Sequence, residues 1–292
     1  MIVKGGVYMI QVKNLEYVYQ KSGKRAVQKI DFSIDQGEIF GFLGPSGAGK
    51  TTTQRILIGL LHGYDGSVQI MGKERKLWKQ DFFENIGVAF DFPNLYVKLT
   101  GMENLELIQS YYQNQSQDIH ELMRRVGLQA DKDKKVEGYS KGMKMRLNFI
   151  RAIMHDPKLL FFDEPTSGLD PVNAKIIKDM IMELKQQGKT IFLTTHNMTV
   201  AEQLCDRVAF IVDGQIPVIE KPSELMVEHG TQVVQLDYYS HGQECREAFP
   251  MKTIQKNEQF FQIMREHKIK RIHSQEATLE DVFIKLTGRE LA

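Results

Sequence analysis

The stretch Gly44-Pro45-Ser46-Gly47-Ala48-Gly49-Lys50-Thr51 decides the fold of this chain. It matches the pattern GxxxxGK[ST], in which glycines let the backbone turn tightly and direct N–H groups toward phosphate oxygens. The apolar run Glu38–Leu43 predicts a buried strand before the loop. Apolar spacing from Thr51 to Leu61 predicts a helix after it, whose N-terminus attracts anions. We therefore interpret this stretch as a phosphate-binding loop rather than a chance glycine-rich turn.

Each part of this loop suits one part of a magnesium nucleotide. Lys50 is expected to reach the β- and γ-phosphates, and the Thr51 hydroxyl to ligate magnesium. The remaining backbone N–H groups surround the phosphates. The predicted nucleotide-binding residues of the loop are Gly44, Pro45, Ser46, Gly47, Ala48, Gly49, Lys50, Thr51 and Thr52.

A second part of the site is predicted where two other apolar strands end. Leu159–Phe162 is followed by Asp163 and Glu164. In a parallel sheet these acids lie beside the phosphate loop, where Asp163 would hold magnesium and Glu164 would orient or deprotonate the attacking water. Without the loop, two acids at a strand end are equally well explained as a solvated terminus. His196 follows the strand Thr190–Thr195, and a γ-phosphate contact competes there with a purely structural histidine.

The rest of the chain predicts an α/β fold. Its core is a P-loop NTPase parallel sheet flanked by helices, with an antiparallel β subdomain, a helical subdomain and a small α+β C-terminal appendage. We expect an ATPase domain over residues 1–218, with the helical subdomain at about 93–157, and the appendage over 219–292. Antiparallel strands are predicted at Ile10–Val12 and Gln28–Ile34, and another strand at Ser67–Met71. In the appendage, strands are predicted at Gln232–Tyr238 and Phe260–Met264, and a helix at Leu279–Thr287.

Composition excludes several classes of protein. Of the 292 residues, 42% are apolar, which is enough for a sizeable core, and the formal net charge of +1 gives no reason to expect a nucleic-acid partner. The two cysteines, Cys205 and Cys245, form no metal-ligand spacing and indicate a reducing compartment. Because no run of about 18 apolar residues occurs, any membrane role is expected to come through a partner.

Five segments in this order resemble the motifs of the ATP-binding cassette (ABC) ATPases. The resemblance extends over about Ile10 to Gly214, and the order of all five segments makes it specific. The segments are Gly44–Thr52, Tyr139-Ser140-Lys141-Gly142-Met143, Leu159–Pro165, Ser167-Gly168-Leu169-Asp170 and His196.

The resemblance implies roles that the residues alone do not. Tyr19 matches the aromatic that stacks on adenine, with Tyr17 as a weaker candidate. Ser140 and Gly142 match the signature residues that contact the γ-phosphate of a nucleotide held by another subunit. Asp170 matches a loop that communicates between the two sites. The resemblance thus implies a head-to-tail dimer, a homodimer or a heterodimer, with ATP between its subunits.

The closest subgroup comprises ATP-binding subunits of drug, antibiotic or sodium exporters, which the tail Thr278–Leu291 also resembles. This implies ATP and Mg²⁺ as cofactors, a separate transmembrane permease as partner, and a peripheral position on the cytoplasmic face of the membrane. The helical region from Pro93 to about Met123 would receive a cytoplasmic helix of that permease. Export is the implied direction, and the substrate is chosen by the permease.

Two residues depart from the family pattern. Asp91 stands where the family usually has a glutamine that senses magnesium and links to the permease, so we include Asp91 among the metal-site candidates. Lys141 stands where glycine is common, either as a solvated surface lysine or as added positive charge near the partner's γ-phosphate. The catalytic candidates Lys50, Glu164 and His196 are all present, which favours a working ATPase.

Two alternatives remain beside the transporter ATPase. A regulatory nucleotide sensor with little turnover is compatible with Asp91 but disfavoured by Glu164. A non-transport ABC ATPase in DNA repair, chromosome maintenance or translation needs long heptad coiled coils or two cassettes in one chain, and this sequence has neither.

Overall fold

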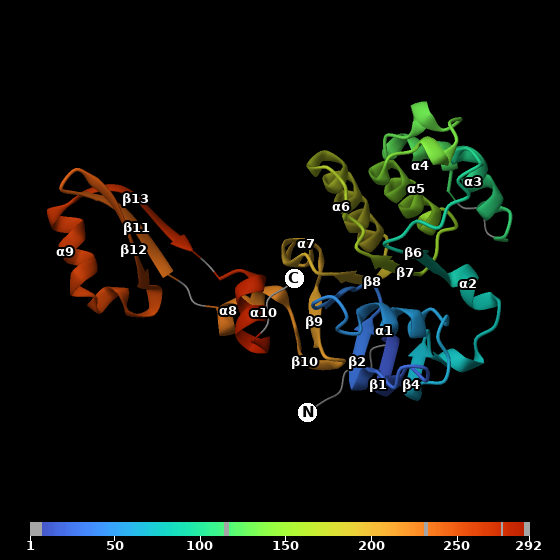
Figure 1. Ribbon diagram of the computed structural model, residues 1–292, viewed down its shortest axis with the longest axis horizontal. Coiled ribbons are helices and arrows are strands. Elements are labelled where there is room, and N and C mark those ends of the chain that lie inside the picture. The colour runs from blue at the N-terminus through green and yellow to red at the C-terminus, as the bar shows by residue number, and fades with distance from the viewer. Residues whose placement is uncertain (1–7, 114–116, 231–232, 276, 289–292) are drawn as a thin grey trace. The chain divides into compact units, whose positions relative to one another are not determined.

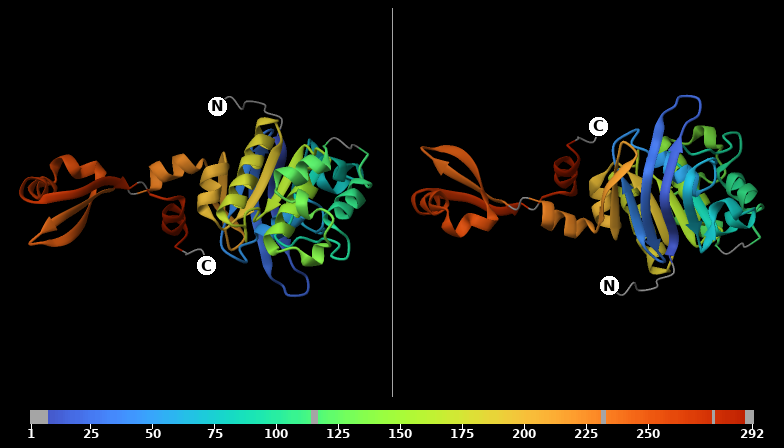
Figure 2. Two further views of the ribbon diagram at one scale, coloured as in Figure 1. Left: turned by 90° about the horizontal axis from the view of Figure 1, so that it is seen from above. Right: turned by 90° about the horizontal axis from the view of Figure 1, so that it is seen from below.

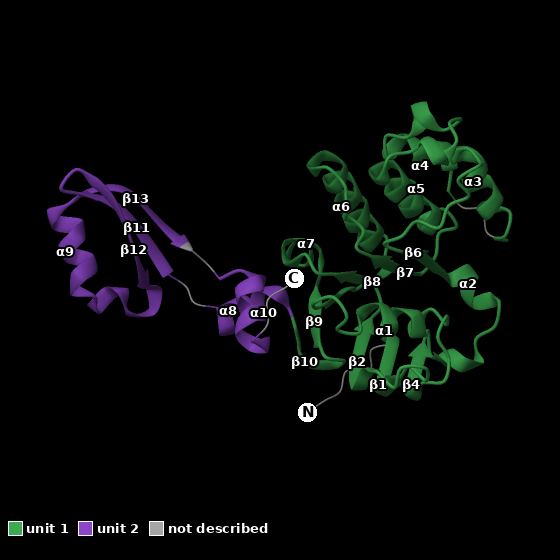
Figure 3. Cartoon of the chain, viewed as in Figure 1, with its two compact units in different colours: residues 1–220, 292 green, residues 221–291 purple. Residues whose placement is uncertain are grey.

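The computed structural model describes residues 8–113, 117–230, 233–275 and 277–288. The chain divides into two compact units, with the boundary between Glu220 and Lys221 (Figure 3). Each unit is built around its own cluster of buried apolar side chains.

The first unit is organised by a six-stranded sheet in the order β10-β9-β3-β8-β7-β6 (Figure 1). All neighbouring strands are parallel except the hairpin β9–β10, which turns at Asp213-Gly214. β3, β7 and β8 are buried along their whole length, as expected for strands covered on both faces. The strands are β3 Ile39–Leu43, β6 Ile86–Ala89, β7 Leu159–Asp163, β8 Thr190–Thr195, β9 Arg207–Val212 and β10 Gln215–Glu220.

A four-stranded antiparallel sheet in the order β2-β1-β4-β5 packs against this core. Stacked and tilted phenylalanine rings join the two sheets, since Phe32 of β2 contacts Phe40 and Phe42 of β3. The strands are β1 Tyr8–Val18, β2 Arg25–Asp35, β4 Asp65–Ile70 and β5 Lys73–Glu74. Helices fill the view from above, and these antiparallel strands face the viewer from below (Figure 2). The predicted fold class is therefore confirmed.

The segment between β6 and β7 contains no strand among its described residues and forms helices, as predicted. Thr100 begins α3 with a capping box, and Ser140 and Asp170 begin α5 and α6 by accepting backbone N–H groups. The helices of the first unit are α1 Lys50–Leu57, α2 Asp81–Asn85, α3 Gly101–Gln109, α4 Ile119–Arg125, α5 Lys141–Ile153, α6 Pro171–Gln186 and α7 Met198–Leu204. Short 3-10 helices lie at η1 Arg75–Leu77, η2 Gln129–Asp131 and η3 Val136–Gly138.

The helix after the phosphate loop is shorter than predicted, because α1 ends at Leu57 rather than near Leu61. Gly59 adopts φ of +82°, which ends the helix. The buried Arg75 guanidinium lies against Gly59 and donates to the carbonyls of Leu57 and Ile58, at 3.2 and 2.9 Å. A distant arginine thus satisfies the last carbonyls of α1.

The second unit contains the antiparallel sheet β12-β11-β13, covered on one face by α9, and the helix pair α8 and α10. The predicted strand Phe260–Met264 is wrong: these residues lie in α9, where Phe260 and Ile263 pack against the sheet. A five-residue apolar run does not separate the two kinds of element. The elements are α8 Pro222–His229, β11 Val233–Ser240, β12 Gln243–Pro250, η4 Met251–Lys256, α9 Glu258–Glu266, β13 Lys268–Gln275 and α10 Leu279–Thr287.

The other predictions for this unit had mixed outcomes. The helix Leu279–Thr287 is present as α10, and the strand predicted at Gln232–Tyr238 is β11. Gln232 and residues 289–291 of the tail lie outside the described part of the chain. β12, β13 and α8 were not predicted, and in β12 the polar alternation carries little apolar signal.

Candidate functional site: a nucleotide site at three strand ends

Three neighbouring strands of the parallel sheet deliver the predicted catalytic residues to one edge. β8 lies between β3 and β7, with Leu43 opposite Thr195 and Asp163 opposite Thr194. Since parallel strands end at the same edge, the phosphate loop after β3 meets the acids at the end of β7 and His196 after β8. A cavity of about 320 Å³ lies there, lined by Ser46, Lys50, Thr51, Asp91, Asp163, Glu164, Ser167 and His196.

The glycines of the phosphate loop are required for different physical reasons. A Cβ on Gly44 would lie 2.1 Å from the carbonyl oxygen of Ile211, so this position requires close backbone packing. Gly47 and Gly49 have φ of +78° and +118°, a region that favours glycine. The Lys50 ammonium donates to the carbonyls of Gly44 and Pro45, at 2.5 and 3.0 Å.

Burial and neighbouring charges set the electrostatics of the cavity. Burial lowers the pKa of Lys50, while the nearby carboxylates of Glu164 and Asp163 oppose that shift. Burial raises the pKa of Asp163, which also accepts a hydrogen bond from the Thr194 hydroxyl. A polar site with buried opposite charges is suited to an anionic ligand with a divalent cation.

Glu164 is held more firmly than any other predicted catalytic residue. Its carboxylate accepts from the Thr195 hydroxyl at 2.8 Å, from the His196 backbone N–H at 2.8 Å and from His196 Nδ1 at 2.6 Å. Its backbone adopts φ of +50°, a strained conformation for a non-glycine residue. The glutamate side chain is 14% exposed and the histidine 57%, so the pair borders the cavity with the ring toward solvent.

Tyr19 lies at the other end of the phosphate loop. A cavity of about 290 Å³ there is lined by Tyr19, Lys24 and Ala26 together with residues of the loop. The Tyr19 hydroxyl lies 3.1 Å from the Thr52 hydroxyl, and its ring packs edge-on against Tyr17 at 5.0 Å between centroids. Tyr17 instead packs against the apolar core, which leaves Tyr19 as the aromatic at the cavity.

Ser140 and Gly142 are not brought into either cavity. Ser140 begins α5 and accepts the Met143 N–H at 3.2 Å. Gly142 lies beside the loop before α6, where a Cβ would be 3.6 Å from the carbonyl oxygen of Gly168. Asp170 accepts the N–H groups of residues 172 and 173, both at 3.1 Å. The signature residues therefore form a separate surface on the same chain.

The predicted magnesium ligands are a hydroxyl and two carboxylates. Thr51, Asp91 and Asp163 line the same 320 Å³ cavity. Among the described residues, no group of three or more His, Cys, Asp or Glu side chains is arranged to hold a metal. Magnesium commonly binds one or two carboxylates together with substrate phosphates, so these residues fit that metal.

Some residues of the site were not predicted. Ser167 lines the cavity with Glu164, and Lys24 lines the cavity with Tyr19. Ser167 lies in the segment Ser167–Asp170, for which the sequence predicted a role only for Asp170. Thr194 and Thr195 support the two acids only because β7 and β8 are paired, which local sequence does not show.

The fold and this arrangement define an ATP-binding P-loop ATPase. The model of the family described as ABC transporter matches residues 27–167, and that of the fluoroquinolone efflux ABC transporter C-terminal domain matches residues 232–276. A fluoroquinolones export ATP-binding protein of Mycobacterium tuberculosis (strain ATCC 25618 / H37Rv) is 48% identical over 98% of this chain and 95% of its own. A Nod factor export ATP-binding protein I of Cupriavidus metallidurans is 35% identical over 97% of this chain and 98% of its own.

Solved structures agree with these relatives. The ATP binding subunit of an ABC transporter aligns with a TM-score of 0.69 at 28% identity, over 75% of this chain and 92% of its own. A dimeric cassette in a post-hydrolysis state with ADP and Pi aligns with a TM-score of 0.65 at 26% identity, over 73% and 98%. This chain belongs to the ABC transporter family, as an ATP-binding, ATP-hydrolysing subunit. In the described residues no helix has the length and apolar character to cross a membrane.

Proposed function

We propose that this chain uses magnesium ATP to power a separate membrane permease that exports small molecules. The observation that carries the proposal is the fixed Glu164, whose carboxylate is held by Thr195 and His196 at the edge of a cavity that also contains Lys50 and Thr51. A carboxylate so positioned is suited to orienting or deprotonating a water in line with a γ-phosphate.

The residues of this chain would divide the work as follows. The phosphate loop and Lys50 bind the phosphates, and Tyr19 stacks on the base. Magnesium, held by Thr51 and Asp163 with Asp91 nearby, would neutralise the charge that develops on the phosphate oxygens. His196 Nδ1 donates to Glu164, so its Nε2 is the ring nitrogen left to face the γ-phosphate.

A second copy of the chain would complete each nucleotide site. The separate surface of Ser140 and Gly142 supports this arrangement, because a head-to-tail dimer gives such a surface a nucleotide to contact. ATP that binds only the closed dimer favours closure, and hydrolysis allows reopening. We propose a homodimer, attached through the permease to the cytoplasmic face of the membrane.

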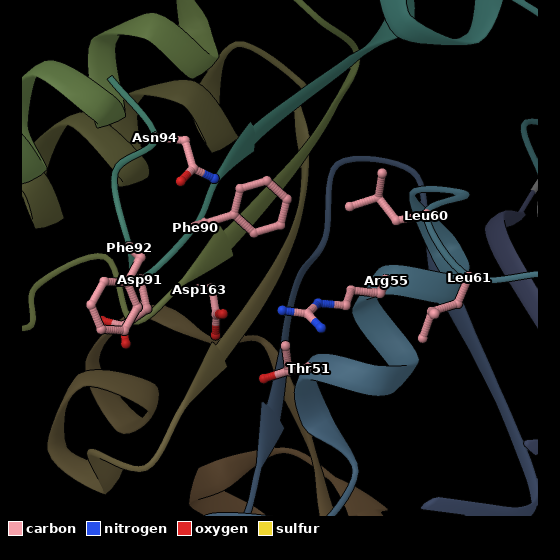
Figure 4. Close-up of a pocket in the computed structure, with 9 residues that line it drawn as sticks. All are labelled: Thr51, Arg55, Leu60, Leu61, Phe90, Asp91, Phe92, Asn94 and Asp163. Carbon is pink, nitrogen blue, oxygen red and sulfur yellow. The ribbon is translucent and has the colours of Figure 1, made fainter. Parts of the chain in front are cut away.

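A cavity beside the magnesium candidates would receive the permease. It has a volume of about 480 Å³ and is lined by Thr51, Arg55, Leu60, Leu61, Phe90, Asp91, Phe92, Asn94 and Asp163. Figure 4 shows the Arg55 guanidinium directed into it. Leu60 and Phe92 are 57% and 80% exposed, which suits an apolar partner helix. Asn94 is the residue of the segment proposed from the sequence, Pro93 to Met123, that lines this cavity, together with Leu60 and Leu61 after α1.

The test is reconstitution with the permease. Co-expression with a candidate transmembrane permease, sought among the genes beside that of this chain, is expected to yield a complex whose ATP turnover responds to fluoroquinolones in membrane vesicles. The names of the relatives motivate this choice of drug. Co-purification of nucleic acid or ribosomes in place of a permease would instead favour a non-transport ABC ATPase.

A regulatory nucleotide sensor is the second candidate, favoured only by Asp91 in the metal cavity. The discriminating measurement compares ATP turnover of the wild type and Glu164→Gln. If the wild type is as inactive as the variant while both dimerise on ATP, the sensor reading replaces the ATPase.

A further inference from the structure

Two side chains of α5 hold the segment that carries Asp91. Asn148 is fully buried, and its amide donates to the carbonyl of Phe90 at 2.8 Å. Arg151, one turn further along the same face of α5, donates to the carbonyl of Asn94 at 2.5 Å and to the side-chain oxygen of Asn148 at 2.6 Å. One hydrogen-bonded pair therefore reaches the backbone on both sides of Asp91.

The stretch between these two carbonyls has few contacts of its own. The Phe90 ring packs against the apolar core, but the Phe92 ring is 80% exposed. Within the part of the chain that the structure describes, Asp91 and Phe92 form no hydrogen bond or ion pair. The position of Asp91 thus depends on how the backbone is held at Phe90 and Asn94.

Arg151 carries a charge that no acid compensates. Burial lowers the pKa of Arg151, and the groups that oppose this shift are the hydroxyls of Tyr112 and Tyr96 rather than a carboxylate. A half-buried guanidinium bonded only to neutral oxygens is costly to keep. Its planar fork, however, can donate to two acceptors at once, which a lysine or an amide in its place could not do equally well.

The position of Asp91 matters for the metal cavity. Its carboxylate is close enough to Asp163 to help raise the pKa of that acid, and both residues line the cavity with Thr51. Figure 4 shows Asp91 on the same segment as Phe90 and Asn94, beside the larger cavity. Groups that serve a metal site must be held within about 0.5 Å of their working position, so the contacts that fix their backbone influence the site.

We propose that Asn148 and Arg151 are positioning residues of the magnesium site, which hold Asp91 at the metal cavity through the carbonyls of Phe90 and Asn94. The proposal rests on the proposed magnesium ATPase. It assigns a role in the reaction to two residues of α5 that line neither the metal cavity nor the nucleotide cavity.

The experiment measures the metal requirement of Asn148→Leu in the full chain, because leucine has a similar size but no hydrogen-bonding group. We expect the magnesium concentration for half-maximal ATP turnover to rise about tenfold, the usual effect of losing a residue that supports a metal ligand. Mn²⁺ binding to the ATP-loaded protein should weaken by the same factor, measured by electron paramagnetic resonance in a Glu164→Gln background that retains ATP. Affinity for ATP without metal should not change.

Asn104→Leu is the matched control. Asn104 is also buried and also holds backbone with its amide, but its hydrogen bonds go to Tyr96 and Thr100 and not to the flanks of Asp91. This variant should lose a similar amount of stability to urea and keep the metal requirement of the wild type. An equal rise in the two variants would overturn the proposal in favour of a general loosening of the helical segment.

A double variant tests whether the effect passes through Asp91. In an Asp91→Ala background, Asn148→Leu should change neither metal measurement further, since the carboxylate that it positions is absent. A further tenfold rise would show that Asn148 acts on the fold and not through Asp91, and the proposal would be wrong.

Arg151→Lys keeps the charge but cannot donate to both acceptors in the same way, and it gives a second test if Asn148→Leu does not fold. Its metal requirement should lie between those of the wild type and the Asp91→Ala variant, and a wild-type value would remove Arg151 from the proposal. If the wild type neither hydrolyses ATP nor binds Mn²⁺ with ATP, the proposed ATPase itself fails. A normal wild type with an unchanged Asn148→Leu overturns only the positioning role.

Discussion

Glu164 combines a strained backbone with a carboxylate that accepts three hydrogen bonds. Glu164→Gln replaces one carboxylate oxygen with an NH2 group, which donates instead of accepting and cannot take a proton from the attacking water. We expect ATP turnover to fall by about 10²–10⁴-fold while nucleotide affinity is kept. Phosphate release and equilibrium binding measure the two effects. Glu183→Gln, on the exposed side of α6, is the matched control and should leave turnover unchanged.

Asp163 illustrates a conflict between stability and ligand binding. Burial raises its folded pKa, so its ionised form destabilises the fold at neutral pH, and this cost disappears as the pH falls below the unfolded value near 3.8. Asp163→Asn keeps an oxygen that accepts from Thr194 and should increase the free energy of unfolding at pH 7 by on the order of 1 kcal/mol. Urea unfolding of both proteins in the presence of a metal chelator, at pH 7 and again at pH 4, measures this difference in the free energy of unfolding. If Asp163→Asn were less stable than the wild type at pH 7, the claim that the buried, ionised Asp163 destabilises the fold would be contradicted.

Asp91 lies in the cavity with Asp163 and Thr51. Replacing it with glutamine, the residue usual in the family, removes one negative charge near the metal. We expect the magnesium concentration for half-maximal turnover to rise about tenfold. This corresponds to the loss of about 1.4 kcal/mol of attraction between the carboxylate and the metal. Asp91→Glu, which keeps the charge, is the control. An unchanged magnesium requirement would remove Asp91 from the metal site.

At the scale of elements, the phosphate loop depends on close contact with the neighbouring strand β9. Gly44→Ala places a Cβ 2.1 Å from the carbonyl oxygen of Ile211, and backbone cannot move away as a side chain does. We expect a loss of about 1–3 kcal/mol in the free energy of unfolding, the usual cost of overpacking, together with weaker ATP binding. Gly138→Ala is the control, because a Cβ there meets no atom within 4 Å. Equal unfolding midpoints for the two variants would disprove the packing argument.

The elements also show what local sequence can predict. β3, β7 and β8 were predictable because each is a short strand with an apolar centre, followed by a polar turn or site residue. α9 was mistaken for a strand because five residues are too few to show the helical period of 3.6 residues. The apolar face of α9 packs against β11, a contact that only the folded unit shows. The end of α1 was misplaced because the Arg75 side chain that satisfies it comes from 18 residues away in the sequence.

In the candidate site, too, local sequence predicts some features, and others depend on contacts between distant segments. Lys50, Asp163 and Glu164 could be named from motif and strand order. The left-handed backbone of Glu164 and its bond to Thr195 depend on the register between β7 and β8, which no local pattern contains. The contact between Lys141 and Gly168 likewise joins two segments that only the folded chain brings together.

At the scale of the molecule, the two units have separate cores, and every predicted nucleotide residue lies in the first. We therefore expect a chain ending at Glu220 to fold cooperatively and to bind ATP with the affinity of the full protein. Urea unfolding and nucleotide titration of both chains provide the comparison. Loss of binding on truncation, with the fold retained, would show that the second unit contributes to the nucleotide site.

The strand order of the parallel sheet has a consequence for how the protein is made. The strand carrying the phosphate loop, β3, has β8 and β9 as its two neighbours, and both come about 150 residues later in the chain. At a synthesis rate of about 5–20 residues per second, β3 remains without a partner strand for roughly 8–30 seconds during synthesis. ATP therefore cannot assist the nascent chain early, and the apolar strand Ile39–Leu43 stays exposed during that interval, where a chaperone could protect it.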